Sequence, residues 1–189
     1  LTPLCASRRL TELSLSGACV ASLAPLSGLA KLTTLSVMNP GLLDAAPIGE
    51  LTTLTSLRLF GFSGDQLAKA YTGRSRKLAS AYLGYCTLTP EANRAIFAQT
   101  RLKAIGFTQV HGLDASAESW AALNELTSLQ MNGGELADLG FLSKYVTTTV
   151  VKLTDVRVGD GADLCTVDFD KYFIHLANVP TEQMVKLLA

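Results

Sequence analysis

Residues 54–62, LTSLRLFGF, decide the fold of this chain. Leu54, Leu57 and Leu59 follow the pattern L-x-x-L-x-L, in which one residue separates the last two leucines. This alternation predicts a short strand whose leucines point inward while the intervening residues face solvent. The pattern returns along the chain at a regular interval. A period of roughly 20 to 50 residues is typical of a solenoid, in which each repeat buries the apolar edge of its neighbour.

Six copies of the pattern lie on an almost constant grid. The interval between their first leucines is the same from Leu10 to Leu32 and from Leu32 to Leu54, and it is slightly longer, and again constant, from Leu54 to Leu126. The triads are Leu10, Leu13, Leu15; Leu32, Leu35, Val37; Leu54, Leu57, Leu59; Leu78, Ala81, Leu83; Leu102, Ile105, Phe107; and Leu126, Leu129, Met131. An irregular α/β domain, in which leucines recur by chance, would not be expected to keep this spacing.

The tail follows the grid less closely. A seventh triad is predicted at Leu153, Val156 and Val158, after a longer interval than any before it. An eighth strand is expected around Phe173 and Leu176, before a short helix at 181–188. We therefore predict one solenoid over residues 1–189, with repeats near 10–31, 32–53, 54–77, 78–101, 102–125, 126–152 and 153–189.

The segments that return from one strand to the next differ in length. Pro25 and Pro47 interrupt the first two, which are too short for a long helix. In the longer repeats we expect helices after Thr89 and after Ser116, each an N-cap residue, and a shorter helix around 66–71. Pro3 precedes Pro25 by the same interval that separates Pro25 from Pro47, so the chain starts inside a repeat. We expect it to be a fragment of a longer array.

These repeats resemble the leucine-rich repeat family. The first half is similar to the 22-residue class of internalins and phosphatase-regulating repeat proteins, and longer, less regular repeats follow. The class pattern L-x-x-L-x-L-x-x-N-x-I-x-x-I-x-P-L-x-x-L is met over 10–29, except at the asparagine. The resemblance implies an α/β fold: a curved leucine-rich repeat solenoid with a parallel β-sheet on the concave face. Short helices and irregular segments would cover the convex face. It also implies a binding role rather than an enzyme.

The chain departs from the family at the turn after each strand. Where the family keeps an asparagine whose amide satisfies backbone groups, this chain has Ala18, Pro40, Phe62, Cys86, Val110 and Gly134. An asparagine ladder therefore cannot form at these positions. Each missing hydrogen bond forgoes roughly 0.5–1.5 kcal/mol, so we expect looser, more irregular turns than in a family member that has the ladder.

Composition argues against several classes of ligand. Apolar residues make up 48% of the 189 residues, and 16 basic residues balance 16 acidic ones. Nucleic acid and anionic membranes are unlikely partners because no excess of positive charge exists. Residues 13–30 carry no charge, but Pro25 and glycines interrupt them, so no membrane span is predicted.

The cysteines and histidines predict no metal or cofactor. Cys5, Cys19, Cys86 and Cys165 are widely separated and form no C-x-x-C pair, so a zinc site is not expected. Scattered cysteines favour a reducing compartment, and we expect an intracellular, cytoplasmic location rather than an extracellular one. Cys86, like the two histidines, is interpreted as structural.

The outward positions of adjacent strands should form columns about 4.8 Å apart per strand. One predicted column holds Ser14, Ser36, Arg58, Tyr82, Gly106, Gln130 and Arg157. Large side chains gather on three neighbouring strands, and aromatic residues with arginine are typical of binding hot spots. The predicted protein-binding residues are Met38, Arg58, Phe60, Tyr82 and Tyr85. The alternative is that Phe60 and Tyr85 pack locally without a partner.

A second candidate is a basic patch after the third strand, made of Lys69, Arg74, Arg76 and Lys77. Such a run is most often a solvated face, although an acidic protein or RNA could bind it. Only Tyr71 accompanies it, and single-stranded nucleic acid sites use several aromatic side chains. RNA is therefore a weak alternative.

No catalytic motif is visible: G-x-S-x-G, H-E-x-x-H and a P-loop are all missing from the sequence. We predict a non-catalytic scaffold that binds protein partners through the solenoid surface, with no small-molecule substrate. Two alternatives remain open. One is the substrate-recognition arm of a multi-domain enzyme such as a ubiquitin ligase, and the other is an extracellular adhesin-like array.

Overall fold

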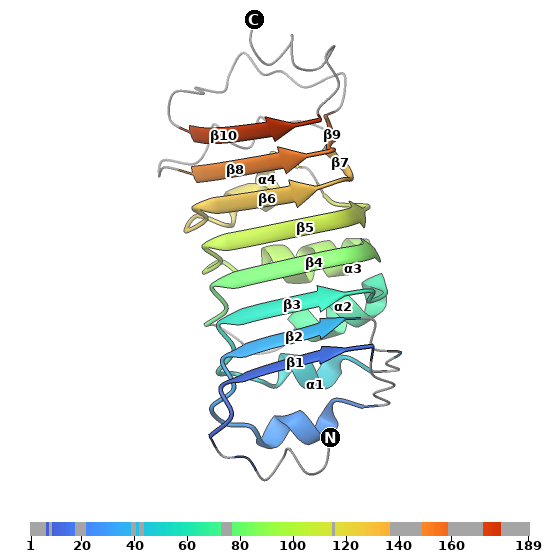
Figure 1. Cartoon of the computed structure of the whole chain (residues 1–189), viewed down its shortest axis with the longest axis vertical. Coiled ribbons are helices and arrows are strands. Elements are labelled where there is room, and N and C mark those ends of the chain that lie inside the picture. Colours follow the sequence, from blue (N-terminus) through green and yellow to red (C-terminus); the bar gives the residue numbers. More distant parts are fainter. Residues whose placement is uncertain are drawn as a thin grey trace, which may run out of the picture.

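The computed structural model describes residues 7, 9–17, 22–38, 41, 44–72, 77–114, 116–136, 149–158 and 172–178. Within them, parallel strands are stacked one above another from the N-terminal to the C-terminal end of the chain (Figure 1). The sheet order is β1-β2-β3-β4-β5-β6-β8-β10, so successive strands of the sheet are neighbours. This is the arrangement that the repeated triads predict.

The strands are short and evenly spaced. The main sheet contains β1 (Glu12–Ser16), β2 (Thr34–Met38), β3 (Ser56–Phe60), β4 (Ser80–Thr87), β5 (Ala104–His111), β6 (Ser128–Asn132), β8 (Thr149–Thr154) and β10 (Tyr172–Ala177). A second, two-stranded parallel sheet pairs β7 (Glu135–Leu136) with β9 (Arg157–Val158).

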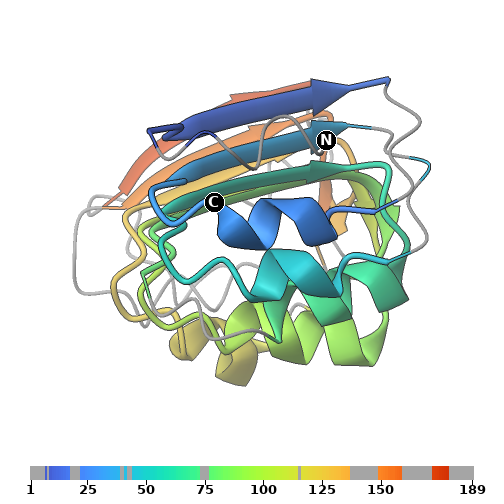
Figure 2. The same cartoon turned by 90° about the horizontal axis from the view of Figure 1, so that it is seen from below.

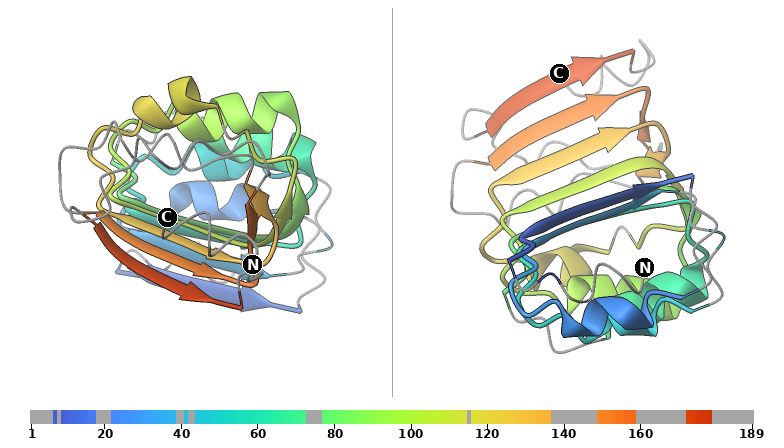
Figure 3. Two further views of the ribbon diagram at one scale, coloured as in Figure 1. Left: turned by 90° about the horizontal axis from the view of Figure 1, so that it is seen from above. Right: turned by 60° about the horizontal axis from the view of Figure 1, so that its bottom comes forward.

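The return segments form the other layer. They contain a 3-10 helix, η2 (Ala24–Gly28), and the α-helices α1 (Ala46–Gly49), α2 (Gly64–Tyr71), α3 (Pro90–Phe97) and α4 (Ala117–Ala121). These helices lie on one side of the sheet, and its ends curve away from them, so the open face is concave (Figures 2 and 3). We call this helix-free side the concave face.

The helices begin where the sequence predicts. Thr89 caps α3 by accepting a hydrogen bond from the Ala92 N–H, at 3.2 Å, and Ser116 caps α4 in the same way. Ser63 and Gln66 form a reciprocal capping box at the start of α2. The proline-bearing segments of the first two repeats hold only η2 and α1, which are five and four residues long.

The triad leucines form the core between the two layers. Leu54, Leu57 and Leu59 are exposed by 1%, 2% and 0%, which confirms their predicted inward orientation. Trp120 of α4 is fully buried and makes edge contacts with Phe97 and Phe107, with ring centroids 5.1 and 6.3 Å apart. The core is one continuous cluster that runs along the array.

The predicted seventh triad is wrong. Val151 and Leu153 of β8 lie in register with Leu129 and Met131 of β6, which restores the offset found between the first strands. Arg157 lies instead in β9, where it pairs with Glu135. Threonines stand at the start of this repeat, where the other repeats have leucine. The apolar pattern is therefore first met at later residues, which shifts the predicted triad.

The corrected register also changes the outward column at this end. Lys152 occupies the place predicted for Arg157, and His175 of β10 lies beside Lys152. The expected eighth strand is present as β10, with Ile174 and Leu176 opposite Val151 and Leu153. The helix predicted at 181–188 lies outside the described residues.

The turns after β3, β4 and β5 are held without the asparagine ladder. Phe62, Cys86 and Val110 occupy the asparagine positions and are buried, with exposures of 2%, 7% and 1%. β4 and β5 continue through the turn, since Cys86 pairs with Val110. Backbone bonds between repeats, such as Leu88 N–H to His111 O at 2.8 Å, satisfy the polar groups. These turns are therefore not loose; Ala18 and Pro40 lie outside the described residues.

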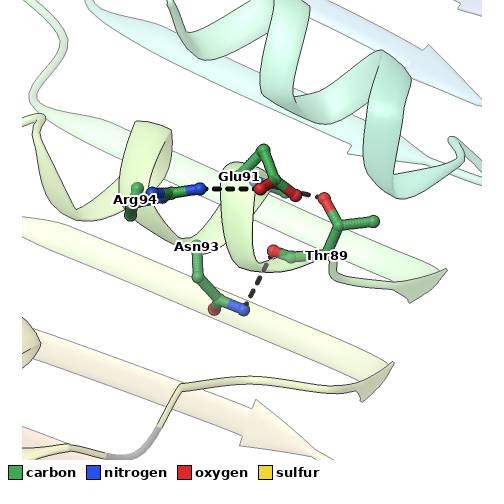
Figure 4. A network of polar contacts seen from close by, with 5 residues as sticks. Thr89, Glu91, Asn93 and Arg94 are labelled. Carbon is green, nitrogen blue, oxygen red and sulfur yellow. Dashed lines mark hydrogen bonds and ion pairs between the residues drawn. The ribbon is translucent and has the colours of Figure 1, made fainter.

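One asparagine of α3 makes further polar contacts between neighbouring repeats. The Asn93 amide nitrogen donates to the Thr89 carbonyl at 3.2 Å (Figure 4). It also donates to the Gly112 carbonyl at 2.8 Å. Its side-chain oxygen accepts from the Asp114 N–H at 2.9 Å. Asn93, 6% exposed, thus ties α3 to the turn of the next repeat.

Threonines reinforce the opposite edge of the sheet, where the strands begin. The hydroxyl groups of Thr33, Thr55 and Thr127 donate to carbonyl oxygens of the preceding repeat, at 3.1, 3.2 and 3.0 Å. Hydrogen bonds between repeats therefore connect neighbouring strands at both of their ends, and this fixes the register of the outward columns.

Candidate functional site

A groove of about 570 Å³ lies on the concave face across the first six strands. Its lining residues are Ser14, Ser36, Met38, Arg58, Phe60, Tyr82, Gly106, Phe107, Thr108 and Gln130. Four of the predicted binding residues, Met38, Arg58, Phe60 and Tyr82, line this one depression. We call it the concave groove.

Strand alternation and register bring these side chains together. Leu57 and Leu59 of β3 point into the core, so Arg58 and Phe60 face outward. Arg58 lies opposite Tyr82 of β4, and Phe60 lies opposite Met38 of β2. The sequence could predict this juxtaposition because repeat spacing alone fixes which residues are neighbours across the sheet.

Each of the two groove aromatics lies across a glycine of the next strand. A Cβ placed on Gly84 would overlap the ring of Phe60, and a Cβ placed on Gly106 would overlap the ring of Tyr82. The glycines therefore provide the space that the rings occupy, as in aromatic coverage of strand glycines. Both rings are half-buried, so part of each remains accessible on the concave face.

Arg58 is stacked on the aromatic wall of the groove. Its Cζ atom lies 5.3 Å from the centroid of the Tyr82 ring, a cation–π distance. The side chain is exposed, and the sole ion pair between described residues joins Arg94 to Glu91 on α3. The Arg58 guanidinium thus retains hydrogen-bond donors that no carboxylate of the described chain occupies.

Tyr85, the fifth predicted residue, lies outside the concave groove. Its ring contacts Phe60 at a centroid distance of 6.4 Å, and 64% of the residue is exposed. It lines a second depression of about 600 Å³ at the carboxyl ends of the strands, with Gln109 and His111 among its other lining residues. The Phe60–Tyr85 pair thus stands between the two depressions. Local packing of Phe60 and Tyr85, the alternative, is therefore also present.

Tyr85 belongs to a column of left-handed residues: Tyr85 and Gln109 lie within β4 and β5, and Gly61 and Gly133 directly follow β3 and β6. Tyr85 and Gln109 have φ angles of 53° and 50°, and Gly61 and Gly133 of the flanking repeats have φ angles of 76° and 71°. Left-handed backbone is unfavourable for an aromatic residue. The repeat geometry imposes this conformation on whichever residue occupies the position.

Only part of the predicted basic patch lies within the described residues. Lys69 is an exposed residue of α2, on the helical side of the sheet, and Lys77 is exposed before β4. Arg74 and Arg76 lie outside the described residues. Neither lysine lines the concave groove.

Two buried titratable groups, Cys86 and Tyr71, lie outside the concave groove. Burial raises the pKa of Cys86 to about 11, so its thiol stays protonated at neutral pH and is a poor nucleophile. Burial also raises the pKa of Tyr71, with a smaller contribution from Cys86. Among the described residues, no group of three His, Cys, Asp or Glu side chains could hold a metal ion.

Sequence reasoning missed three features of this surface. No role was predicted for Gly84 or Gly106, although they accommodate the rings of Phe60 and Tyr82. Lys152 was missed because the register of the seventh strand was wrong. The sequence did contain a signal for the two glycines. Each lies one repeat after an aromatic residue, at the outward position beside that residue on the next strand.

The one-repeat-per-strand sheet, the short helices of the convex side and the leucine core define a leucine-rich repeat solenoid. Comparison with solved structures gives the same fold. The chain is similar to an internalin C2 of Listeria monocytogenes (TM-score 0.51, 19% identity, 93% of this chain and 65% of that one). It is also similar to an internalin, InlF, of the same organism (0.64, 17%, 99% and 61%).

A third similar structure is human 5T4, the trophoblast glycoprotein, with a TM-score of 0.66, 19% identity, and coverage of 92% of this chain and 71% of that one. The chain spans less than two thirds of the length of the two internalins. No family model and no curated protein sequence matches it.

The comparisons contradict the expectation of an intracellular location. The similar structures, two internalins and 5T4, are secreted or cell-surface proteins, so they do not support the expected cytoplasmic location. Cysteine spacing misled the prediction, because it says little about the compartment when no disulfide pairing can be read. In the described part of the chain, no helix has the length and apolar character needed to cross a membrane.

Proposed function

We propose that this chain is a protein-binding solenoid that holds a partner in the concave groove. The observation that carries the proposal is the convergence of Met38, Arg58, Phe60 and Tyr82 in a depression of about 570 Å³. An open concave face is the surface that solenoids use for extended binding sites. Exposed aromatic and arginine side chains are enriched among the residues that dominate binding energy.

We infer further that the partner is met outside the cell, as in an adhesin-like array. The similarity to internalins and to 5T4 supports this choice over an intracellular scaffold. The role is non-catalytic: Cys86 is protonated and buried, and the described polar clusters serve helix capping and turn packing.

The test is capture of partners from a display library of extracellular domains by the purified chain. The variant Arg58→Ala/Phe60→Ala removes the guanidinium and one ring without touching the core, so we expect at least about tenfold weaker binding. The matched control is Asp65→Ala/Glu118→Ala, two exposed residues of α2 and α4 on the other side of the sheet, which should bind normally. Unchanged capture by the groove variant would refute the proposal.

A further inference from the structure

The charges of the concave face are unevenly distributed. On strands β1 to β6 and β8 of the main sheet, the outward positions carry one carboxylate, Glu12 on β1, and two cations, Arg58 on β3 and Lys152 on β8. The positions between the cations hold Tyr82, Gly106 and Gln130, which are neutral. The lining of the groove therefore carries one cation, Arg58, and no carboxylate.

Arg58 is the better placed of the two cations to recognise an anion. Its guanidinium lies on the Tyr82 ring at 5.3 Å, which limits the rotamers it can adopt. A stacked guanidinium keeps its in-plane N–H donors free, and these match the two oxygens of a carboxylate. Lys152, whose strand neighbours are Gln130 and His175, has no cation–π contact among the described residues.

We propose that Arg58 binds an aspartate or glutamate side chain of the protein partner, and that Phe60 and Met38 take an adjacent apolar side chain. This rests on the proposed function, and it adds the chemistry of the partner. Met38 is 37% exposed and lies beside Phe60 in register, which gives an apolar contact next to the charged one.

A carboxylate fits this site better than a phosphate group. Doubly charged anions are usually held by clustered cations or by helix N-termini. Here Lys152 lies four strand spacings from Arg58, about 19 Å at 4.8 Å per strand, so the two cations cannot share one anion. A single guanidinium against an aromatic ring matches a single negative charge.

The experiment is selection of random displayed peptides on the full chain, followed by binding measurements with the selected peptides. The peptides should be long enough to cross four strands at about 4.8 Å each. We expect the wild-type chain to enrich Asp or Glu next to an apolar residue. Arg58→Ala should weaken these peptides by about tenfold or more, and Arg58→Lys by less.

Charge reversal gives the sharpest readout. Arg58→Glu should select peptides with Lys or Arg in place of the acidic residue, because the side chain at position 58 then carries a negative charge instead of a positive one. Lys152→Ala is the control for diffuse attraction and should change affinity by less than about threefold. An equal loss in Lys152→Ala and Arg58→Ala would overturn the inference, as would an acidic preference that persists in Arg58→Glu.

The two proposals can fail separately. If Phe60→Ala abolishes binding but the wild-type chain shows no preference for acidic residues, the groove binds proteins and the carboxylate inference is wrong. If neither Phe60→Ala nor Arg58→Ala affects the selected peptides, the groove itself is not the binding site. If the wild-type chain enriches no peptide, the groove does not recognise a short acidic segment.

Discussion

The ring of Tyr82 on β4 lies across Gly106 on β5, so that a Cβ at position 106 would sit 2.6 Å from Tyr82 Cε1. The same ring supports the Arg58 guanidinium from the other side of the strand. A glycine on one repeat thus positions a cation two strands away. The concave groove depends on this succession of Arg58, Tyr82 and Gly106.

Adding a methyl group at position 106 should disturb the ring and the arginine together. Gly106→Ala is expected to cost about 1–3 kcal/mol of folding stability, because the ring must leave its place. In a Tyr82→Ala background the same change should cost little, since nothing then occupies the space. Denaturant unfolding of the wild type, the two single variants and the double variant measures the coupling between positions 82 and 106.

The control for this double-mutant cycle is Gly28→Ala in η2. A Cβ there meets no atom within 4 Å, and the glycine has no positive φ. It should leave stability unchanged or slightly raise it. Equal costs for Gly106→Ala in both backgrounds would mean that the Tyr82 ring does not rest on this glycine.

Truncation of a triad leucine should destabilise the whole array. Leu57→Ala is expected to cost roughly 2–5 kcal/mol, because Leu57 is 2% exposed and its removal leaves a cavity between repeats. Thermal or denaturant unfolding measures the loss. Thr52→Ala, at an exposed position of the preceding repeat, should stay within about 0.5 kcal/mol of wild type.

Loss of the Asn93 amide should loosen the turn of the next repeat. Asn93→Ala removes the partners of the Gly112 carbonyl and the Asp114 N–H, for an expected cost of about 1–3 kcal/mol. Hydrogen exchange at the Asp114 amide should become faster. Asn124→Ala, at an exposed position, is the comparison and should change neither quantity. An unaltered exchange rate in Asn93→Ala would show that the turn holds without this contact.

Asp114 should make a small contribution to the pH dependence of stability. A hydrogen bond from the Ser119 hydroxyl, at 2.6 Å, and one from the Ser116 N–H lower its pKa in the folded state. A lowered pKa stabilises the folded state above the unfolded pKa of about 3.9, and this stabilisation is lost as pH falls through the folded value.

Unfolding measured at pH 7 and pH 3 should therefore show that Asp114→Asn is less stable than wild type at pH 7, with the gap narrowing at pH 3. Solvent screening keeps the difference small, because the side chain is half-exposed. A gap that widens on acidification would contradict the assigned hydrogen bonds.

The hydroxyl group of Tyr71 should be dispensable for folding. It is buried, and no described group hydrogen-bonds to it. Tyr71→Phe should be neutral or should stabilise the fold by up to about 1 kcal/mol, since an unsatisfied buried polar group is removed. Urea unfolding measures the change. A loss of more than about 1 kcal/mol would indicate that the hydroxyl group has a partner.

Repeat spacing allowed much of the fold and part of the site to be predicted. Parallel pairing places Leu13, Leu35 and Leu57 side by side because their offset is one repeat, and the same arithmetic brings Arg58 to Tyr82. Prediction failed at β8, where threonine at the start of the repeat weakened the pattern. It also failed for the turns, because polar contacts between distant residues carry no periodic signal.

The sequence by itself determined the solenoid, its leucine core and the order of the outward columns, since all three follow from residue type and a fixed period. Tertiary structure alone decided how the side chains of those columns lie. Tyr82 could cover Gly106 or extend into solvent, and only packing against the neighbouring strand selects the first. Asn93 likewise supports the turn at Gly112 because α3 and the next repeat meet in space, 19 residues apart in the chain.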